Sequence, residues 1–158
     1  MSSPVPASSN AVSRRMAATR GKDNPREREI RSALHLRGLR FRIHYCGIPG
    51  TRRSIDIAFT RVRLAILCDG CFWHGCPIHA TVPKANREWW IEKISSNKAR
   101  DRDTDERLVG GGWRVLRIWE HVPIDEAVES IIAHLQELNR SSPANVRKRG
   151  ATPVAWIG

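Results

Sequence analysis

Cysteine and histidine side chains cluster in a short segment near the middle of the chain. The pattern Cys71-x4-Cys76-x2-His79 places two thiols and one imidazole within nine residues. Soft thiolates and imidazoles at short spacing are ligands of tetrahedral zinc, and a structural zinc site needs four protein ligands. His121 is the best candidate for the fourth ligand, because it lies just beyond an expected strand at 113–119 and strand ends bring distant segments together. The alternative, two inert cysteines and two surface histidines, is disfavoured by this density of ligands, so we expect a structural Zn²⁺ site.

Two acidic side chains fall on neighbouring expected strands. Asp56 lies on the polar face of a strand expected at 54–59, and Asp69 directly follows an apolar strand expected at 62–68. Carboxylates on adjacent strand ends can bind Mg²⁺, which prefers hard oxygen ligands and keeps several waters. An isolated aspartate near a strand is more often a turn or surface residue, so the pattern alone does not decide between the two interpretations.

A third acid and one more histidine could support acid–base chemistry. Asp101 lies seven residues from both Ile94 and Leu108, so it shares their face of an expected helix at 86–109. A carboxylate on an apolar face needs a partner such as His or Arg; the alternative is a helix break at Asn97 that leaves Asp101 in solvent. His74 lies between the two cysteines and is either a further zinc-site histidine or a general base, since its usual pKa near 6.5 suits either role.

Two large aromatic side chains, Phe72 and Trp73, stand in the same loop. They pack over the zinc site or, alternatively, form a wedge that enters a DNA base stack. Met16, in a basic segment near the N-terminus, is a candidate for a second wedge, although methionine is also a common core residue.

Hydrophobic periodicity and turn signals predict an α/β domain with a mixed central sheet flanked by helices. A helix begins at Pro25, after the polar capping residues Asp23 and Asn24, and ends near Gly38. Strands are expected at 39–45, 54–59, 62–68 and 113–119, and further helices at 86–109 and 125–138. The strand at 62–68 is almost wholly apolar, which indicates a central position in the sheet.

Composition limits the class of protein. The chain has 158 residues, which suits one domain, and 27 Lys+Arg against 16 Asp+Glu give a net charge of +11. Such a basic domain most often binds nucleic acid. No apolar run is long enough for a membrane span, and the first residues have no signal core, so we expect a cytoplasmic protein with reduced cysteines. This excludes a secreted disulfide scaffold and an acidic binding module.

The chain divides into three parts by composition. Residues 1–13 are small and polar and are expected to form a disordered tail. Residues 14–140 form the expected domain, of which 14–24 is a basic arm that carries Arg14, Arg15 and Arg20. Residues 141–158 are expected to be a loose C-terminal tail.

Several ordered motifs between about Arg14 and Val122 together resemble the very short patch repair (Vsr) DNA mismatch endonucleases. The motifs are Asp56, Cys71-Phe72-Trp73-His74, Pro83-Lys84-x-Asn86-Arg87-Glu88-Trp89-Trp90-x-Glu92-Lys93-Ile94, Asn97-x-x-Arg100-Asp101-Arg102 and Gly112-Trp113-Arg114-Val115. The resemblance implies a restriction-endonuclease-like fold of the PD-(D/E)xK superfamily. It also implies a Mg²⁺-dependent nick on the 5′ side of the thymine in a T:G mismatch, with a structural zinc ion.

The resemblance assigns roles to individual positions. Asp56 matches a catalytic metal-binding aspartate, and Cys68 a residue whose backbone carbonyl binds the same Mg²⁺, with Asp69 beside it as a further candidate ligand. His74 matches a general base, and Asp101 the acid that supports it. Glu27 matches an acid of the first helix near the active site.

The DNA-binding roles and the partners follow from the same resemblance. Phe72, Trp73 and Met16 match side chains that insert beside the mismatch, and Arg14, Arg15 and Arg20 lie in the DNA-binding arm. The expected partner is double-stranded DNA with a T:G mismatch, bound by a monomer in the bacterial cytoplasm near the nucleoid, with mismatch-repair proteins as further partners.

Two positions depart from the better-known family pattern. The zinc set there has three cysteines and one histidine, whereas this chain offers Cys71, Cys76, His79 and His121, which is an equally valid set. Asp69 replaces a histidine sometimes found there and adds negative charge beside the expected Mg²⁺ site. Three alternatives therefore stay open: a nicking nuclease of the same fold with another DNA specificity, for example in defence; a non-catalytic zinc-containing DNA-binding module; and a zinc scaffold whose charge serves only solubility.

Overall fold

The computed structural model describes residues 24–141 and 153–158. The elements are α2 (Pro25–Leu36), β1 (Arg42–Tyr45), β2 (Ile55–Phe59), β3 (Leu64–Asp69), α3 (Arg87–Gly110), β4 (Arg114–Trp119), α4 (Ile124–Arg140) and β5 (Val154–Ile157). They form a five-stranded sheet in the order β1-β2-β3-β4-β5. β1, β2 and β3 pair antiparallel, whereas β3, β4 and β5 run parallel. The predicted mixed sheet flanked by helices is thus confirmed.

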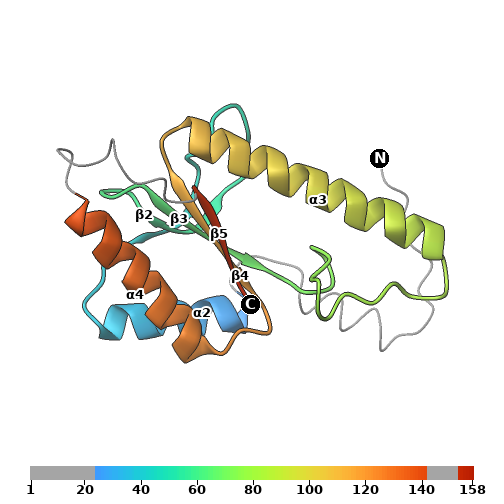
Figure 1. Ribbon diagram of the computed structural model, residues 1–158, viewed down its shortest axis with the longest axis horizontal. Coiled ribbons are helices and arrows are strands. Elements are labelled where there is room, and N and C mark those ends of the chain that lie inside the picture. The colour runs from blue at the N-terminus through green and yellow to red at the C-terminus, as the bar shows by residue number, and fades with distance from the viewer. Residues whose placement is uncertain (1–23, 142–152) are drawn as a thin grey trace.

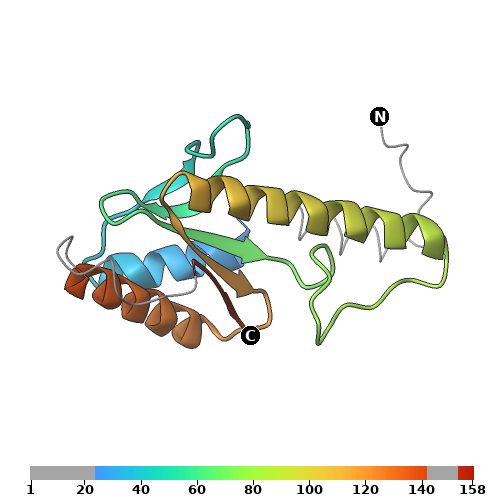
Figure 2. The same cartoon turned by 45° about the horizontal axis from the view of Figure 1, so that its top comes forward.

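The helices lie on both faces of the sheet (Figures 1 and 2). α2 and α4 pack side by side on one face, over a core that includes Ile57, Ile66 and Ile118. α3 crosses the other face, where Leu108 packs against Ala65 and other small or aliphatic residues of the strands. β3 is the central strand and is buried along most of its length, as its apolar sequence predicts.

Local sequence explains where the helices begin. Asn24 caps α2: its side-chain oxygen accepts a hydrogen bond of 2.8 Å from the backbone N–H of Glu27, and Pro25 follows at the first helical position. α3 runs without a break from Arg87 to Gly110, so the break considered at Asn97 does not occur. Instead Asn97 is buried, on the same side of the helix as Trp90, Ile94 and Leu108.

The prediction of a loose segment over 141–158 is wrong for its last residues. Val154–Ile157 forms β5, which pairs with β4 at the edge of the sheet. A run of four strand-forming residues carries too weak a local signal to be assigned without knowledge of the strand that it meets. The predicted tail at 1–13 and the arm at 14–24, apart from Asn24, lie outside the described residues.

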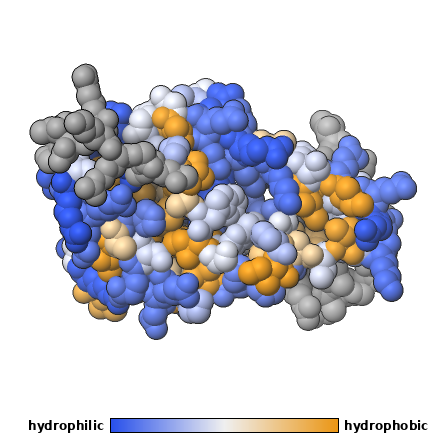
Figure 3. Space-filling view, viewed as in Figure 1, coloured by the Kyte–Doolittle hydropathy of each residue, from blue (hydrophilic) through white to orange (hydrophobic). Residues whose placement is uncertain are grey.

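Hydrophilic residues cover most of the face seen in Figure 3. Hydrophobic patches interrupt this surface at the end of the molecule that carries the loop after β3 and the start of α3. Ile78 and Ile91 in these segments are 66% and 47% exposed. No helix within the described ranges is long and apolar enough to cross a bilayer.

Candidate functional site

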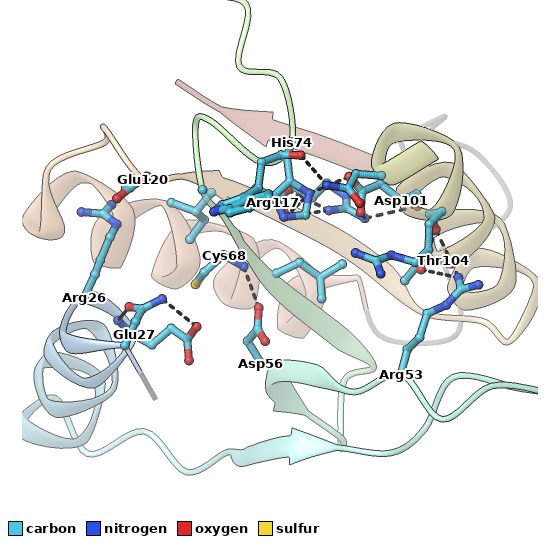
Figure 4. A pocket seen from close by; sticks show the side chains of 18 of the residues that line it. Arg26, Glu27, Arg53, Asp56, Cys68, His74, Asp101, Thr104, Arg117 and Glu120 are labelled. Atoms are coloured by element: carbon cyan, nitrogen blue, oxygen red, sulfur yellow. Dashed lines mark hydrogen bonds and ion pairs between the residues drawn. The ribbon is translucent and has the colours of Figure 1, made fainter. Parts of the chain in front are cut away.

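A pocket of about 650 Å³ opens where α2, β2, β3, the loop after β3 and α3 meet (Figure 4). The sequence predictions placed chemistry on six residues that line it, and they are Glu27, Asp56, Cys68, Asp69, His74 and Asp101. These residues are far apart along the chain and come together only in the folded protein. The pocket therefore brings every predicted acid and the predicted general base to one place.

Asp56 lies on β2, and its carboxylate is held by the neighbouring strand. Its Oδ2 accepts a hydrogen bond of 2.8 Å from the backbone N–H of Cys68 (Figure 4). Burial raises the pKa of Asp56 to about 7; the Cys68 hydrogen bond lowers it, and the negative charges of Glu27 and Asp69 raise it further. A buried carboxylate with other acids nearby gains most from a cation, which is the setting in which Mg²⁺ binds.

Glu27 reaches the same pocket from the first turn of α2. It is only 5% exposed, and Asn24 Nδ2 donates a hydrogen bond of 2.9 Å to its Oε1. Arg31, one turn along the helix, forms an ion pair of 3.2 Å with Oε2. The capping residue and the arginine together fix this carboxylate, so Glu27 and Asp56 present two anchored sets of oxygen atoms to the pocket.

His74 and Asp101 form the second pair. His74 Nδ1 lies 2.6 Å from Asp101 Oδ2. Burial lowers the pKa of His74, but the hydrogen bond to Asp101 and the charges of Asp69 and Asp101 outweigh burial and raise this pKa above its usual 6.5. Burial raises the pKa of Asp101, but the hydrogen bond and charge of His74 outweigh it and lower the pKa below 3.8. With Nδ1 engaged by Asp101, the second ring nitrogen of His74 remains as the proton acceptor.

Backbone contacts hold the loop that carries His74 against α3. The N–H of His74 donates to the carbonyl of Gly70 at 3.1 Å, and Asn97 Nδ2 donates to the carbonyl of Trp73 at 2.8 Å. Gly75 has φ +65°, and a Cβ there would lie 2.4 Å from Lys98 Cε. A side chain at this position would be strained by the positive φ and would have to displace the end of the Lys98 side chain.

Asp69 has a partner that was not anticipated from the sequence. Both of its carboxylate oxygens accept hydrogen bonds from Arg117 Nη1 on β4, at 2.9 and 2.7 Å. The signal for Arg117 was present, since it is a charged residue within the otherwise apolar run 115–119 of β4. A buried charge of this kind requires partners, but the sequence does not say which ones.

The predicted zinc ligands also come together. The ligand atoms of Cys71, Cys76, His79 and His121 all lie within 4.8 Å of one another. Cys71 Sγ and Cys76 Sγ are 3.2 and 3.6 Å from His121 Nδ1, and Cys76 Sγ is 3.9 Å from His79 Nδ1. Zn–S bonds of about 2.3 Å and Zn–N bonds of about 2.0–2.1 Å at tetrahedral angles place the ligand atoms about 3.3–3.8 Å apart. The four donors are close enough to hold one metal ion between them, and His121 is the fourth member of the cluster as expected.

The proton affinity of the thiols bears on the same question. Burial raises the pKa of Cys71 to about 11, and the neighbouring Cys76 adds to the increase. The Cys71 thiol therefore stays protonated near neutral pH unless a cation binds it, and a metal ion bound in the cluster would displace its proton.

The aromatic residues of the loop pack against α3. The Phe72 and Trp73 rings are 5.3 Å apart between centroids, and both contact the Trp90 ring, at 5.1 and 5.9 Å. Trp73 also lines the pocket. The structure thus places the aromatic pair of the loop beside the pocket and against α3. The other predicted DNA-binding residues, Met16, Arg14, Arg15 and Arg20, lie outside the described residues.

Cationic side chains at the pocket were not predicted from the sequence. Arg26, Arg53, Lys93, Arg100 and Arg117 all line it. Arg53 is held by an ion pair of 2.6 Å with Asp103 and a hydrogen bond of 2.7 Å to Thr104, while Arg26 donates to the backbone carbonyls of Trp119 and Val122. A pocket lined by both acids and arginines suits a substrate that is itself anionic and is cleaved with the help of a cation.

Comparison with known proteins gives a consistent result. Residues 8–79 match the family model described as DNA mismatch endonuclease Vsr. The chain is 40% identical over 129 residues to the type II nicking enzyme V.NaeI of Lentzea aerocolonigenes, covering 80% of this chain and 77% of that protein. It is 41% identical over 107 residues to the type II nicking enzyme V.XorIIP of Xanthomonas oryzae pv. oryzae, covering 66% and 76%.

A further relative carries the mismatch name itself. The DNA mismatch endonuclease Vsr of Escherichia coli is 38% identical to this chain over 109 residues, covering 68% of each protein. Identity of this level over most of both chains shows common descent. The chain therefore belongs to the Vsr family and is a DNA nicking endonuclease of that family.

Proposed function

We propose that this chain hydrolyses a phosphodiester bond in one strand of duplex DNA, in a Mg²⁺-dependent reaction at a sequence context of its own. The observation that carries the proposal is the single pocket in which the Asp56 and Glu27 carboxylates lie with the His74–Asp101 pair. Hydrolysis of a phosphodiester needs a cation to neutralise charge on the phosphate and a base for the attacking water. The Asp56 and Glu27 carboxylates suit the cation, and the His74–Asp101 pair supplies the base.

We assign the Mg²⁺ ligands to Asp56 and the backbone carbonyl of Cys68. Glu27, whose two oxygens are already bound by Asn24 and Arg31, adds negative charge beside them from α2. Bound there, Mg²⁺ supplies electrostatic stabilisation of the phosphate and of the leaving 3′ oxygen. Asp69 was also expected from the sequence to be a ligand. Because both Asp69 oxygens accept hydrogen bonds from Arg117, we place Asp69 outside this set.

We assign the role of general base to His74. Its Nδ1 is bound to Asp101, which holds the ring in the tautomer that leaves Nε2 unprotonated once the ring is neutral. Nε2 can then take a proton from the attacking water, while Asp101 stabilises the imidazolium that forms.

Phosphate binding is assigned to basic residues around the pocket and in the arm. Arg53, Lys93 and Arg100 line the pocket from two elements, and Arg14, Arg15 and Arg20 extend the positive charge along the chain. Each phosphate neutralised by such a residue releases counterions, so binding should weaken steeply as salt rises.

We assign structural Zn²⁺ to the Cys71, Cys76, His79 and His121 cluster, because two thiols and two imidazoles are a common zinc ligand set and their ligand atoms lie within 4.8 Å of one another. The ion would fix the loop that carries His74, which lies between the two cysteines.

Cys76→Ser should therefore lose the metal and the activity together. Cys76 is 1% exposed, so the variant leaves an incomplete buried site, and we expect the melting temperature to fall by roughly 5–10 °C. Metal analysis of the purified protein should give one zinc per parent chain and much less in the variant. Cys46→Ser is the matched control, since Cys46 is exposed and outside the cluster. Equal zinc content in the parent and in Cys76→Ser would contradict the assignment.

Nicking beside the thymine of a T:G mismatch is the second candidate specificity. Phe72 and Trp73 favour it, because two aromatic rings beside the pocket can act as a wedge. A T:G wobble pair stacks less well than a Watson–Crick pair, so opening it costs less and a wedge converts this difference into selectivity. The relative from Escherichia coli is named a mismatch endonuclease, whereas the other relatives compared above are named nicking enzymes.

A nicking assay separates these specificities. End-labelled duplexes with T:G or T:A at one position, in several flanking contexts, are incubated with Mg²⁺ and resolved on a denaturing gel. Cleavage of one strand beside the T of T:G alone assigns mismatch repair. Cleavage of one strand in both duplexes at a particular context assigns a nicking enzyme of other specificity. Retained binding without any nick contradicts the proposal and leaves a DNA-binding module.

A further inference from the structure

Arg117 occupies the centre of a buried charge network beside the pocket. It lies on β4, and its side chain is 2% exposed. Its Nη1 binds Asp69 of β3, while its Nε and Nη2 lie within 3.1 Å of the carboxylate of Asp105 on α3. Nη2 also donates to the backbone carbonyl of Asp101 at 3.2 Å. All three guanidinium nitrogens are therefore engaged by groups from two different elements, β3 and α3.

We infer that Arg117 is a positioning residue, which binds Asp69 and the backbone of α3 so that Asp101 alone is the hydrogen-bond partner of His74. The inference rests on the proposed role of His74 as general base. It concerns how the correct carboxylate comes to face the imidazole.

Two carboxylates compete for one ring nitrogen. His74 Nδ1 lies 2.6 Å from Asp101 Oδ2 and 3.5 Å from Asp69 Oδ1. An imidazole nitrogen can donate only one good hydrogen bond at a time. Both oxygens of Asp69 already accept hydrogen bonds from Arg117. The hydrogen bond of His74 Nδ1 is therefore made to Asp101.

The same arginine sets the position of α3 relative to the sheet. Asp101 and Asp105 are one helical turn apart on α3. The guanidinium binds the backbone carbonyl of the first and the carboxylate of the second, so it contacts two successive turns of the helix. A lysine could keep the charge but presents a single nitrogen and cannot hold both elements in a fixed plane. A base displaced by a fraction of an ångström transfers protons poorly, so this clamp bears directly on the reaction.

Strand β5 closes the outer side of the network. Trp156 is the register partner of Arg117, and its ring lies 5.2 Å from the guanidinium carbon. It also stacks on Trp119, with the ring centroids 4.9 Å apart. An arginine covered by an aromatic face is shielded from water and confined to one orientation. The C-terminal strand thus contributes to the position of Arg117.

Arg117→Lys is the direct test, with Arg107→Lys as its control. Arg107 is an exposed arginine on α3 that pairs with Asp103 and lies outside the pocket. For Arg117→Lys we expect the single-turnover nicking rate to fall by about 10- to 100-fold, the usual range for a residue that orients a ligand or base. The Kd for DNA should stay within about threefold, because a buried arginine makes no phosphate contact.

A spectroscopic readout makes the test independent of activity. Long-range ¹H–¹⁵N spectra of the histidine rings report the tautomer of His74, whose signals are identified by comparison with His74→Gln. We expect a dominant Nδ1–H tautomer for neutral His74 in the parent and in Arg107→Lys, and a mixture in Arg117→Lys. Should the parent protein fail to nick DNA, the proposed function fails, but the tautomer measurement still tests the role of Arg117.

Trp156→Ala provides a second variant if Arg117→Lys does not fold. Trp156 is 46% exposed, so its removal leaves the core intact. A several-fold loss of nicking rate at unchanged Kd, with a partial change of the His74 tautomer, supports the inference. The inference is overturned if a folded Arg117→Lys variant keeps the parent tautomer and the parent rate. If Arg117→Lys does not fold, the same result in Trp156→Ala overturns the inference.

Discussion

Asp56→Asn should abolish nicking and leave a protein at least as stable as its parent at pH 8. The activity falls because the substitution removes the principal carboxylate of the proposed Mg²⁺ site. A metal ion stabilises the transition state by several kcal/mol, so we expect the rate to fall by roughly 10³-fold or more. The amide oxygen of Asn can still accept the hydrogen bond from the backbone N–H of Cys68, so the strands remain joined.

The effect on stability follows from the pKa of Asp56, which burial raises from 3.8, the value of a free side chain, to about 7 in the folded chain. Between these two values the unfolded chain loses the proton and the folded chain keeps it. Folding is therefore penalised progressively as pH rises from about 4, and the full penalty applies above pH 7. Asn carries no charge at any pH, so the variant escapes this penalty and gains roughly 1–3 kcal/mol at pH 8 without added Mg²⁺.

Urea unfolding at pH 5 and pH 8, beside the nicking assay, measures both effects. Asp125→Asn is the matched control: Asp125 is an exposed acid in the first turn of α4 and does not line the pocket. There we expect parent-like nicking and a small loss of stability, of about 0.3–1 kcal/mol, as the helix N-terminus loses a favourable charge. An Asp56→Asn variant that nicks at the parent rate would remove Asp56 from the mechanism, and one that unfolds more easily at pH 8 would contradict the raised pKa.

The sequence predicted most of the sheet and the members of the metal cluster because these depend on local patterns. Apolar runs and capping residues locate α2, β2, β3 and β4 to within a few residues. Thiols and imidazoles at close spacing indicate a metal site, and the one distant member of the cluster, His121, was predicted because it follows a strand end. Asp101 was found because a polar residue interrupts an apolar helix face.

What escaped prediction depends on contacts between distant segments. β5 forms because it pairs with the open edge of β4, and the sequence of Val154–Ile157 does not identify that partner. Asp69 was read as a metal ligand because its strand neighbours are visible in the sequence, whereas Arg117 lies 48 residues away. The alternation expected at 39–45 is absent from β1, where Ile43 is exposed and the adjacent His44 and Tyr45 are both half-buried; His44 also has a positive φ of 46°. A pattern identifies a charge that needs a partner, but only the fold says which partner it has.

His74→Ala should reduce the nicking rate by about 10² to 10⁴, the usual loss when a positioned general base is removed. DNA binding should change little, because the ring is paired with Asp101 and His74 is not among the basic residues to which phosphate binding is assigned. Added imidazole should restore part of the rate, since a small base can enter the vacated space. Full activity in His74→Ala would assign the base to another group.

The pH dependence of the rate separates the roles of His74 and Asp101. The proposed base works only when neutral, so the parent rate at saturating Mg²⁺ should rise with pH as His74 loses its proton. Because Asp101 raises the pKa of His74, this rise should be centred above 6.5. Asp101→Asn removes the negative charge, so the rise should move to lower pH while the plateau rate falls, since the amide no longer stabilises the imidazolium. If Asp101 only filled space, the plateau would fall without any shift of the profile; a shift to higher pH would show that His74 is not the titrating group.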